Sequence, residues 1–467
     1  MSGRRLTPQQ AVETALGLRR GDGCIVIADE HSHVDLRWAA NSLTTNGTTR
    51  TDRLTVIVTV DGARGTAVGS IGQSGVTAEQ VADLVEAAEH TAREAAPSPD
   101  AQPLATPDTA GGGGPWDEPP AHTSPDVFTG LADSLGDAFG AAASAGTELF
   151  GFAEHEVTTT YLGTSTGVRL RHDQPQGRLE LNAKSDARTR SSWTGIGTAD
   201  FTDVDVPAAT AHLATQLGWA KRRVELPAGR YETVLPPSAV ADLLVYLYWS
   251  AGAREAHDGR TVFSRAGGGT RIGERIASVP ITIRSDPAAP GLACAPFVVA
   301  HTSSSEQSVF DNALPSGPVS WVDQGVLSAL IQTRHTASLT GQPATFPVDN
   351  LIASADGATG DLDTLVGRVR RGLLLTCLWY VRQVDARTLL LTGLTRDGVY
   401  LVEDGEVVGA VNNFRFNESP VGMLTRVLDV GRTERTLARE LSDYFPRTAM
   451  PAMRIADFNM STVSDAS

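Results

Sequence analysis

Apolar and polar residues alternate in four short segments late in the sequence, and turn residues separate these segments. The alternating segments are Leu389–Leu394, Val399–Val402, Val407–Val411 and Phe414–Phe416. Arg396-Asp397-Gly398 follows the first segment, and Glu403-Asp404-Gly405-Glu406 follows the second. Asp-Gly between alternating hydrophobic residues is a strong hairpin signal, so the pattern predicts a β-meander. One polar face of this meander is expected to carry Asn412, Asn413, Arg415 and Asn417.

Helical spacing of apolar residues alternates with strand-like runs in the rest of the chain. Helices are predicted at Thr7–Leu18, Thr77–Ala95, Asp126–Ala145, Val206–Arg222, Ala239–Ala253, Thr364–Arg371 and Thr433–Asp443. Early strands are predicted at Cys24–Ala28 and Val34–Ala40, with a turn between them, and at Leu54–Asp61. Val240–Trp249 is apolar nearly all round, which predicts a helix buried on more than one side. Its aromatic residues either fill the core or face a partner.

Length and these patterns together predict an α+β protein of two domains, because 467 residues exceed one typical domain. Residues 1–222 are expected to form a mixed α/β N-terminal domain. Residues 223–467 are expected to form a C-terminal domain, largely antiparallel β and meander- or barrel-like, around the buried helix. Residues 97–125 contain Gly111–Gly114 and Pro119-Pro120 and are expected to be a loop or a disordered insertion.

Charge and cysteine content exclude several classes of protein. A net charge of −15 disfavours nucleic-acid binding, which needs clustered Lys and Arg. Cys24, Cys294 and Cys377 are odd in number and far apart, so neither a disulfide framework nor a zinc knuckle is predicted. No apolar signal core follows the first residues, and the longest apolar run, Leu243–Trp249, is too short to span a bilayer. We therefore expect a soluble cytoplasmic protein without a membrane partner.

Metal-binding motifs are scarce. His31 and His33 form an H-x-H pair before Asp35, on a predicted turn, and no third ligand is identifiable. A zinc peptidase helix needs two histidines one turn apart with a glutamate that activates water, and no H-E-x-x-H pair occurs. His257 reads as part of a turn.

Nucleophile and phosphate-loop patterns are weaker still. Ser303–Ser305 follow His301 but lack a G-x-S-x-G elbow. Cys377 is favoured as a buried thiol, and Gly267–Gly269 lack the Lys-Ser/Thr of a phosphate loop.

The run Gly372–Met423, which includes Leu389-Leu-Leu-Thr-Gly-Leu-Thr-Arg-Asp-Gly398 and Asn412-Asn-Phe-Arg-Phe-Asn-Glu-Ser419, resembles the core of the TldD/PmbA (TldE) family of bacterial metallopeptidase-related proteins. Further segments extend the resemblance over nearly the whole chain, apart from residues 97–125. They are Gly65–Ala95, Leu226–Leu244, Phe310–Pro315 and Asp323–Leu327.

The resemblance implies a role without chemistry of its own. TldD-type subunits carry H-E-x-x-x-H on the central helix and a cysteine ligand late in the chain. Here the corresponding helix has neither histidine nor glutamate, and no cysteine follows Cys377. The degenerate metal positions are Leu244, Tyr246, Tyr248 and Trp249. This is the TldE-like pattern, which implies no catalytic residue, metal or cofactor in this chain.

The resemblance also implies a partner. A TldD-like subunit is expected to supply zinc, and the heterodimer is expected to enclose a chamber that cleaves short, unfolded or modified peptides. Asn412, Asn413, Arg415 and Asn417 are then candidates for binding peptide or partner, or else ordinary turn and edge-strand residues. Two alternatives stay open: a stand-alone, homodimeric peptide-binding module, and a metallopeptidase with an unconventional site built from His31, His33 or His257.

Overall fold

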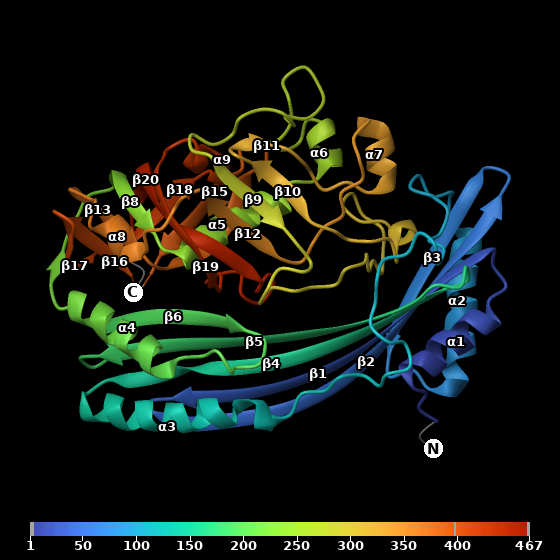
Figure 1. The fold of residues 1–467 in the computed structure, drawn as a ribbon, viewed down its shortest axis with the longest axis horizontal. Coiled ribbons are helices and arrows are strands. Elements are labelled where there is room, and N and C mark those ends of the chain that lie inside the picture. Colours follow the sequence, from blue (N-terminus) through green and yellow to red (C-terminus); the bar gives the residue numbers. More distant parts are fainter. Residues whose placement is uncertain (1–3, 397, 465–467) are drawn as a thin grey trace.

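Two sheets, one antiparallel and one largely antiparallel with three parallel strand pairs, organise the molecule in this computed structural model, which describes residues 4–396 and 398–464 (Figure 1). The N-terminal sheet is six-stranded, in the order β3-β2-β1-β4-β5-β6. Its strands are β1 Gly23–Ala39, β2 Ser42–Gly62, β3 Gly65–Ser74, β4 Glu148–Thr164, β5 Arg169–Ser185 and β6 Arg190–Thr198. The α+β fold class is confirmed.

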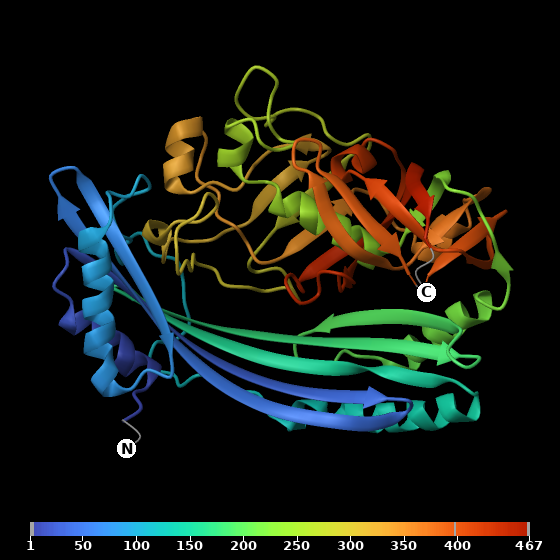
Figure 2. The ribbon, with the colours of Figure 1, turned by 180° about the vertical axis from the view of Figure 1, so that it is seen from behind.

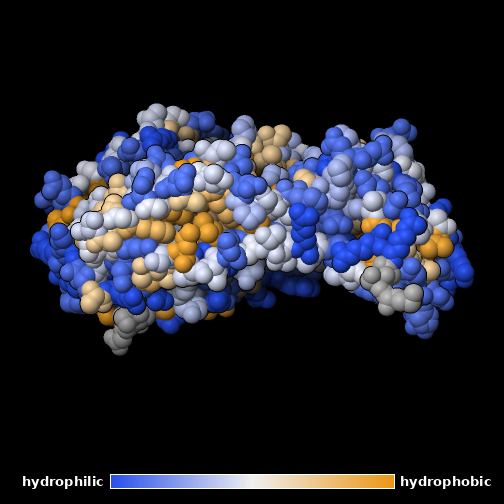
Figure 3. All heavy atoms as spheres, turned by 90° about the horizontal axis from the view of Figure 1, so that it is seen from below, coloured by the Kyte–Doolittle hydropathy of each residue, from blue (hydrophilic) through white to orange (hydrophobic). Residues whose placement is uncertain are grey.

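Four helices cover one face of the N-terminal sheet: α1 Pro8–Leu18, α2 Val81–Glu94, α3 Thr129–Ser144 and α4 Val206–Trp219. α1 and α2 pack on Val26 and its neighbours at one end, while α3 and α4 pack on Leu36 and its neighbours at the other. Since alternate strand residues share a face, Asp29, His31, His33, Asp35 and Arg37 point to the opposite side. Seen from below, apolar and pale residues gather over the α3–α4 end (Figure 3).

The C-terminal sheet lies over that opposite face, as the view from behind also shows (Figure 2). Its 14 strands among the described residues are β7 Arg223–Val224, β8 Gly229–Leu235, β9 Ile281–Ser285, β10 Val319–Asp323, β11 Val326–Leu327, β12 Leu351–Ala355, β13 Arg371–Leu375, β14 Leu378–Asp385, β15 Leu390–Thr395, β16 Val399–Glu403, β17 Glu406–Val411, β18 Phe414–Glu418, β19 Val427–Thr436 and β20 Thr448–Val463.

Short helices connect these strands: α6 Ala253–His257, α7 Arg334–Thr340, α8 Leu362–Val366, α9 Pro420–Leu424 and the 3-10 turn η3 Val309–Asp311. Two further 3-10 turns, η1 Ala78–Gln80 and η2 Pro125–Phe128, precede α2 and α3 in the N-terminal part of the chain. The longer α5, Pro237–Trp249, belongs to the largest apolar cluster. None of the helices in the described chain is long and apolar enough to cross a membrane.

The predicted meander is right in its strands and wrong in its pairing. β16 and β17 form the expected hairpin, with Asp404 and Gly405 both at positive φ (49° and 83°). β15, however, pairs with β14 and β18, and β16 pairs with β13, so β15 and β16 are not hairpin partners. Part of the predicted turn between them, Asp397, lies outside the described residues. Long-range pairing therefore overrides the local turn signal.

Two further local predictions are wrong. No turn separates Cys24–Ala28 from Val34–Ala40, because both lie in the 17-residue strand β1, paired on both sides. The helix predicted at Thr433–Asp443 is instead the end of β19, held against β20 up to Thr436, followed by turns.

Residues 97–125 contain no helix or strand before Pro125, and they lie against the N-terminal sheet and the segment between β9 and β10. The Asp100 carboxylate accepts hydrogen bonds from Ser98, Ser303 and Ser308, and Ala105 is buried. Gly111 donates its N–H to the carbonyl oxygen of Ala313 at 2.8 Å, a close approach of two backbone segments that the absence of a Cβ permits.

Candidate functional site

α5 is the helix on which a metal site would be expected, and it is packed on nearly all sides. Pro237 opens it at a position where a missing N–H costs no helical hydrogen bond. Leu244 is fully buried and Tyr248 nearly so, while Tyr246 and Trp249 are partly buried and pack against the same core. The Tyr246 hydroxyl donates to the carbonyl of Val381 at 2.7 Å, and the Tyr248 hydroxyl donates to that of Val348 at 2.9 Å.

Trp249 completes this packing. Its ring lies 5.6 Å from that of Tyr246, and 6.4 Å from that of Phe445, which follows β19. Side chains thus fill the volume around the four degenerate metal positions.

Asp242 is an ionisable group of α5 that the sequence analysis overlooked. It is fully buried, and its Oδ1 accepts the Glu440 backbone N–H at 2.9 Å, while Oδ2 has no hydrogen-bond partner. Burial raises the pKa of Asp242 to about 8, and the partial charge of the Glu440 N–H offsets only part of this. A single carboxylate among apolar neighbours is not a metal site.

The segment Leu437–Pro446, here called the bridging loop, joins α5 to the N-terminal sheet. The Arg439 guanidinium lies 4.2 Å from the ring centre of Trp379 on β14 and 5.1 Å from that of Trp193 on β6. Farther along the loop, Ser442 and Asp443 contact β5. The loop therefore spans both sheets.

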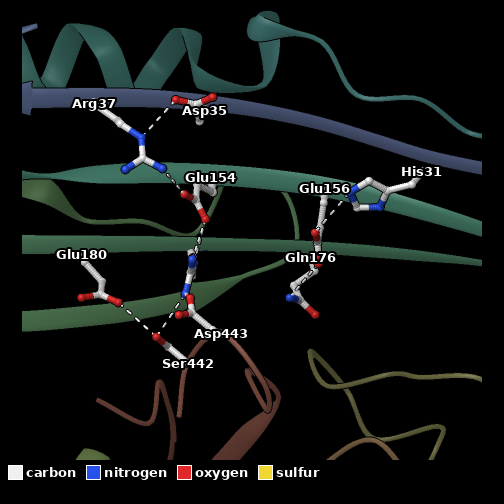
Figure 4. Close-up of polar contacts among 10 residues, drawn as sticks. His31, Asp35, Arg37, Glu154, Glu156, Gln176, Glu180, Ser442 and Asp443 are labelled. Carbon is white, nitrogen blue, oxygen red and sulfur yellow. Dashed lines mark hydrogen bonds and ion pairs between the residues drawn. The ribbon is translucent and has the colours of Figure 1, made fainter. Parts of the chain in front are cut away.

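Opposite the bridging loop lies a row of charged side chains that we call the polar face (Figure 4). It consists of His31, His33, Asp35 and Arg37 on β1, Glu154 and Glu156 on β4, and Gln176, Arg178 and Glu180 on β5. Strand register brings them together, because Asp35 is opposite Glu154, and Glu154 is opposite Arg178. No short sequence motif contains this set.

Arg178 is the centre of the polar face. It donates to Glu154 from Nη2 at 2.6 Å and from Nε at 3.0 Å, and it pairs with Asp443 of the bridging loop. Glu154 also accepts from Arg37 at 2.8 Å. Burial lowers the pKa of Arg178, but the hydrogen bonds and charges of Glu154 and Asp443 outweigh it and raise the pKa overall.

Carboxylates outnumber guanidinium groups at this site. Five carboxylates, those of Asp35, Glu154, Glu156, Glu180 and Asp443, stand against the guanidinium groups of Arg37 and Arg178 and of Arg447, which donates to Gln176. A cavity of about 80 Å³ lies between the polar face and the bridging loop. This volume has room for two or three water molecules at roughly 30 Å³ each, and it is too small for a peptide segment.

His31 and His33 do not come together with a further metal ligand. Their rings stack 6.4 Å apart, and His31 Nε2 lies 3.7 Å from Glu156. Within residues 4–396 and 398–464, no group of three or more His, Cys, Asp or Glu side chains is arranged to hold a metal ion. His257 ends the short α6, away from this pair in the fold (Figure 1).

The four polar meander residues split into two environments. Asn412 is buried, and its Oδ1 accepts the Leu226 N–H at 2.7 Å, which fixes the start of the C-terminal sheet. Asn413 is half-buried beside Thr395. Arg415 and Asn417 share one face of β18, where Arg415 is exposed and Asn417 half-buried, while Phe414 and Phe416 point into the core.

The remaining candidates have structural surroundings. The Ser303 hydroxyl donates to Asp100, whereas His301 contacts Thr55 and Asp29. Burial raises the pKa of Asp29, and the Thr160 hydrogen bond and the charges of His301 and Arg53 offset only part of it. Cys377 is buried.

Gly267–Gly269 all have positive φ in a turn between Ser264 and Thr270, which only a glycine run forms without strain.

Comparison with known proteins supports one family. A family model, the PmbA/TldA metallopeptidase C-terminal domain, matches residues 228–462. The fold is similar to that of TldE from Thermococcus kodakarensis, with a TM-score of 0.77 and 15% identity over 96% of this chain and 98% of that one. Comparison with curated protein sequences gives no significant match.

Two further solved structures share the fold. A proposed modulator of DNA gyrase from Thermotoga maritima matches with a TM-score of 0.74 and 16% identity over 94% of this chain and 95% of that one. Another proposed modulator of DNA gyrase, from Bacteroides thetaiotaomicron, matches with a TM-score of 0.74 and 15% identity over 98% of both chains.

Proposed function

Because the chain belongs to the PmbA/TldA (TldD/PmbA) metallopeptidase family, we propose that it is the non-metal subunit of a two-component peptidase. Its partner is a TldD-like subunit that holds zinc on its own central helix and supplies the hydrolytic chemistry. Together they enclose a cytoplasmic chamber in which short, unfolded or modified peptides are bound and cleaved.

The packing of α5 is the observation that carries this proposal. Leu244 is fully buried, and the hydroxyls of Tyr246 and Tyr248 are committed to backbone carbonyls. A metal centre needs several convergent ligands and an open coordination position for water or substrate. Large side chains bonded to the core leave no such position on this helix, so cleavage is assigned to the partner.

The outer side of β18 is a surface available for peptide or partner, whereas the bridging loop covers the polar face. Arg415 and Asn417 remain candidates, because their side chains point away from the core. Asn412 fits a structural role better, since its amide carbonyl is bonded to the backbone of Leu226.

Co-purification tests the proposal. The chain is expressed alone and together with the TldD-like protein of the same genome, and zinc is measured in each preparation. We expect the two chains to co-purify, zinc to follow the partner, and the mixture to digest an unfolded peptide that neither chain digests at the same rate alone.

A chelator supplies the decisive control. Hydrolysis by the mixture is expected to stop with 1,10-phenanthroline and return with added zinc. Chelator-sensitive digestion by this chain alone, with stoichiometric zinc, would overturn the proposal.

A further inference from the structure

β2 has an unpaired edge beside the polar face. All of β1 pairs with residues 42–59 of β2. On the other side of β2, β3 pairs only from Arg53 onward. Among the described residues, no strand pairs with the outer side of Ser42–Asp52, which we call the open edge. Apart from the partly buried Gly47 and Asp52, the residues of the open edge are exposed.

The open edge has only part of the usual protection against strand addition. Natural edge strands are short, bulged, covered or marked by Pro and charged residues, above all Lys. This one is eleven residues long and contains neither Pro nor Lys, and five of its residues are threonine. Its charged residues, Arg50 and Asp52, lie toward one end, and the register shift of the β1–β2 pair, next to Thr44, lies toward the other. A strand of this length presents backbone donors and acceptors over roughly 35 Å. Such an edge fits an extended peptide.

Gly47 opens the edge toward a carboxylate of the polar face. It lies opposite Asp35 in the β1–β2 register, and a Cβ on Gly47 would come within 2.6 Å of Asp35 Oδ1. The Asp35 carboxylate therefore occupies the space that a side chain at position 47 would need. An added strand would lie about 9–10 Å from β1, two strand spacings away. A Lys or Arg side chain spans most of that gap.

Charge distinguishes two possible occupants of the open edge, a second copy of this chain and a peptide with a basic side chain. The polar face and the bridging loop together carry six carboxylates against three guanidinium groups, because the loop adds Arg439, Glu440 and Asp443. The whole chain has a net charge of −15, so two copies repel each other. A segment with a basic side chain is attracted to both the local and the overall field.

We propose that the open edge binds an extended peptide segment as an additional antiparallel strand, with a Lys or Arg side chain directed across Gly47 to Asp35. This proposal deepens the proposed function, on which it rests for the nature of the ligand. It assigns the peptide contact to backbone pairing on β2 and the side-chain preference to Asp35.

Binding is measured on the chain alone, by fluorescence anisotropy, so that its failure is distinguishable from failure of hydrolysis by the two-subunit enzyme. The probes are a labelled ten-residue Thr/Val peptide with one central Lys, the same peptide with Glu in its place, and a Lys peptide N-methylated at alternate residues. We expect the Lys peptide to bind about tenfold tighter than the Glu peptide. The N-methylated peptide is expected not to bind.

Three variants test the geometry. Thr48→Pro and Thr49→Pro are made as a matched pair, because adjacent strand residues direct their N–H groups to opposite sides. The one that leaves the melting temperature unchanged removes an outward N–H, and it is expected to lose peptide binding. Asp35→Asn is expected to keep backbone binding and reduce the Lys-over-Glu preference to nearly one.

Two results would overturn the proposal. One is unchanged peptide binding in the folded proline variant. The other is a stable dimer in sedimentation that the proline variant dissociates, because the open edge would then be an interface between copies of this chain.

Discussion

α5 and the polar face lie on opposite sides of the bridging loop, and they differ in how much of their side-chain surface is exposed to solvent. Most of α5 is excluded from solvent, whereas Arg37 keeps 50% of its side-chain surface exposed and Asp443 keeps 61%. Apolar burial stabilises in proportion to area, while exposed ion pairs contribute little. The comparison teaches that the packing of α5 contributes more to stability than the ion pairs of the polar face.

The largest effect is expected from a cavity in α5. Leu244→Ala should lower the free energy of unfolding by about 3 kcal/mol, because a fully buried leucine loses its packing. Urea unfolding measures this, with Gln176→Ala on the polar face as a control expected to change it by less than about 0.5 kcal/mol. An equal decrease in the free energy of unfolding in both variants would contradict the proposed difference between α5 and the polar face.

An intermediate effect on stability is expected from Asp242, the buried ionisable residue of α5. Burial raises the pKa of Asp242 to about 8, so the folded protein holds a proton there that the unfolded chain releases near its ordinary value. The contribution of protonated Asp242 to folding stability is fully present at pH values below the pKa of the unfolded chain. It is lost as the pH rises through about 8, the pKa of Asp242 in the folded protein.

Asp242→Asn removes this dependence while keeping an oxygen acceptor for the Glu440 N–H. The variant should therefore gain stability relative to the natural chain between pH 5 and pH 8, by roughly 1–3 kcal/mol. Urea unfolding at several pH values measures the difference. Parallel pH profiles of the two proteins would contradict the expectation.

The smallest effect is expected on the polar face. His33→Ala should change the free energy of unfolding by less than about 0.5 kcal/mol, because the side chain is partly exposed and not packed in a core. Zinc titration by calorimetry should be the same for His33→Ala, His257→Ala and the natural chain. A zinc site lost only in His33→Ala would revive the metal hypothesis for the H-x-H pair.

Local and apolar features were predictable from the sequence. The apolar run that became α5 is buried nearly all round, and the Asp404-Gly405 turn forms because both residues tolerate a left-handed backbone. The strands β15 to β18 begin and end within a residue or two of the predicted segments. These features depend on neighbours a few residues apart.

Features that depend on distant neighbours were not predictable. Register alone places Asp35 beside Glu154, across more than a hundred residues of sequence, and Glu154 beside Arg178, 24 residues further along the chain. The polar turn expected at His31–His33 is a continuous strand, because pairing with β2 and β4 satisfies its backbone on both sides. Arg439 and much of the bridging loop lie in Thr433–Asp443, whose apolar spacing predicted a helix. Pairing of β19 with β20 prevents that helix, so the position of Arg439 could not be predicted.

β20 has a consequence for how the protein is made. It forms backbone bonds with β8, β12, β18 and β19, and each of these strands precedes it in the chain. On a translating ribosome, the N-terminal sheet has all six of its strands once Thr198 has emerged, whereas the C-terminal sheet waits for Thr448–Val463. Until then, four unfinished strand edges are exposed to other nascent chains, which makes this interval the period of greatest aggregation risk.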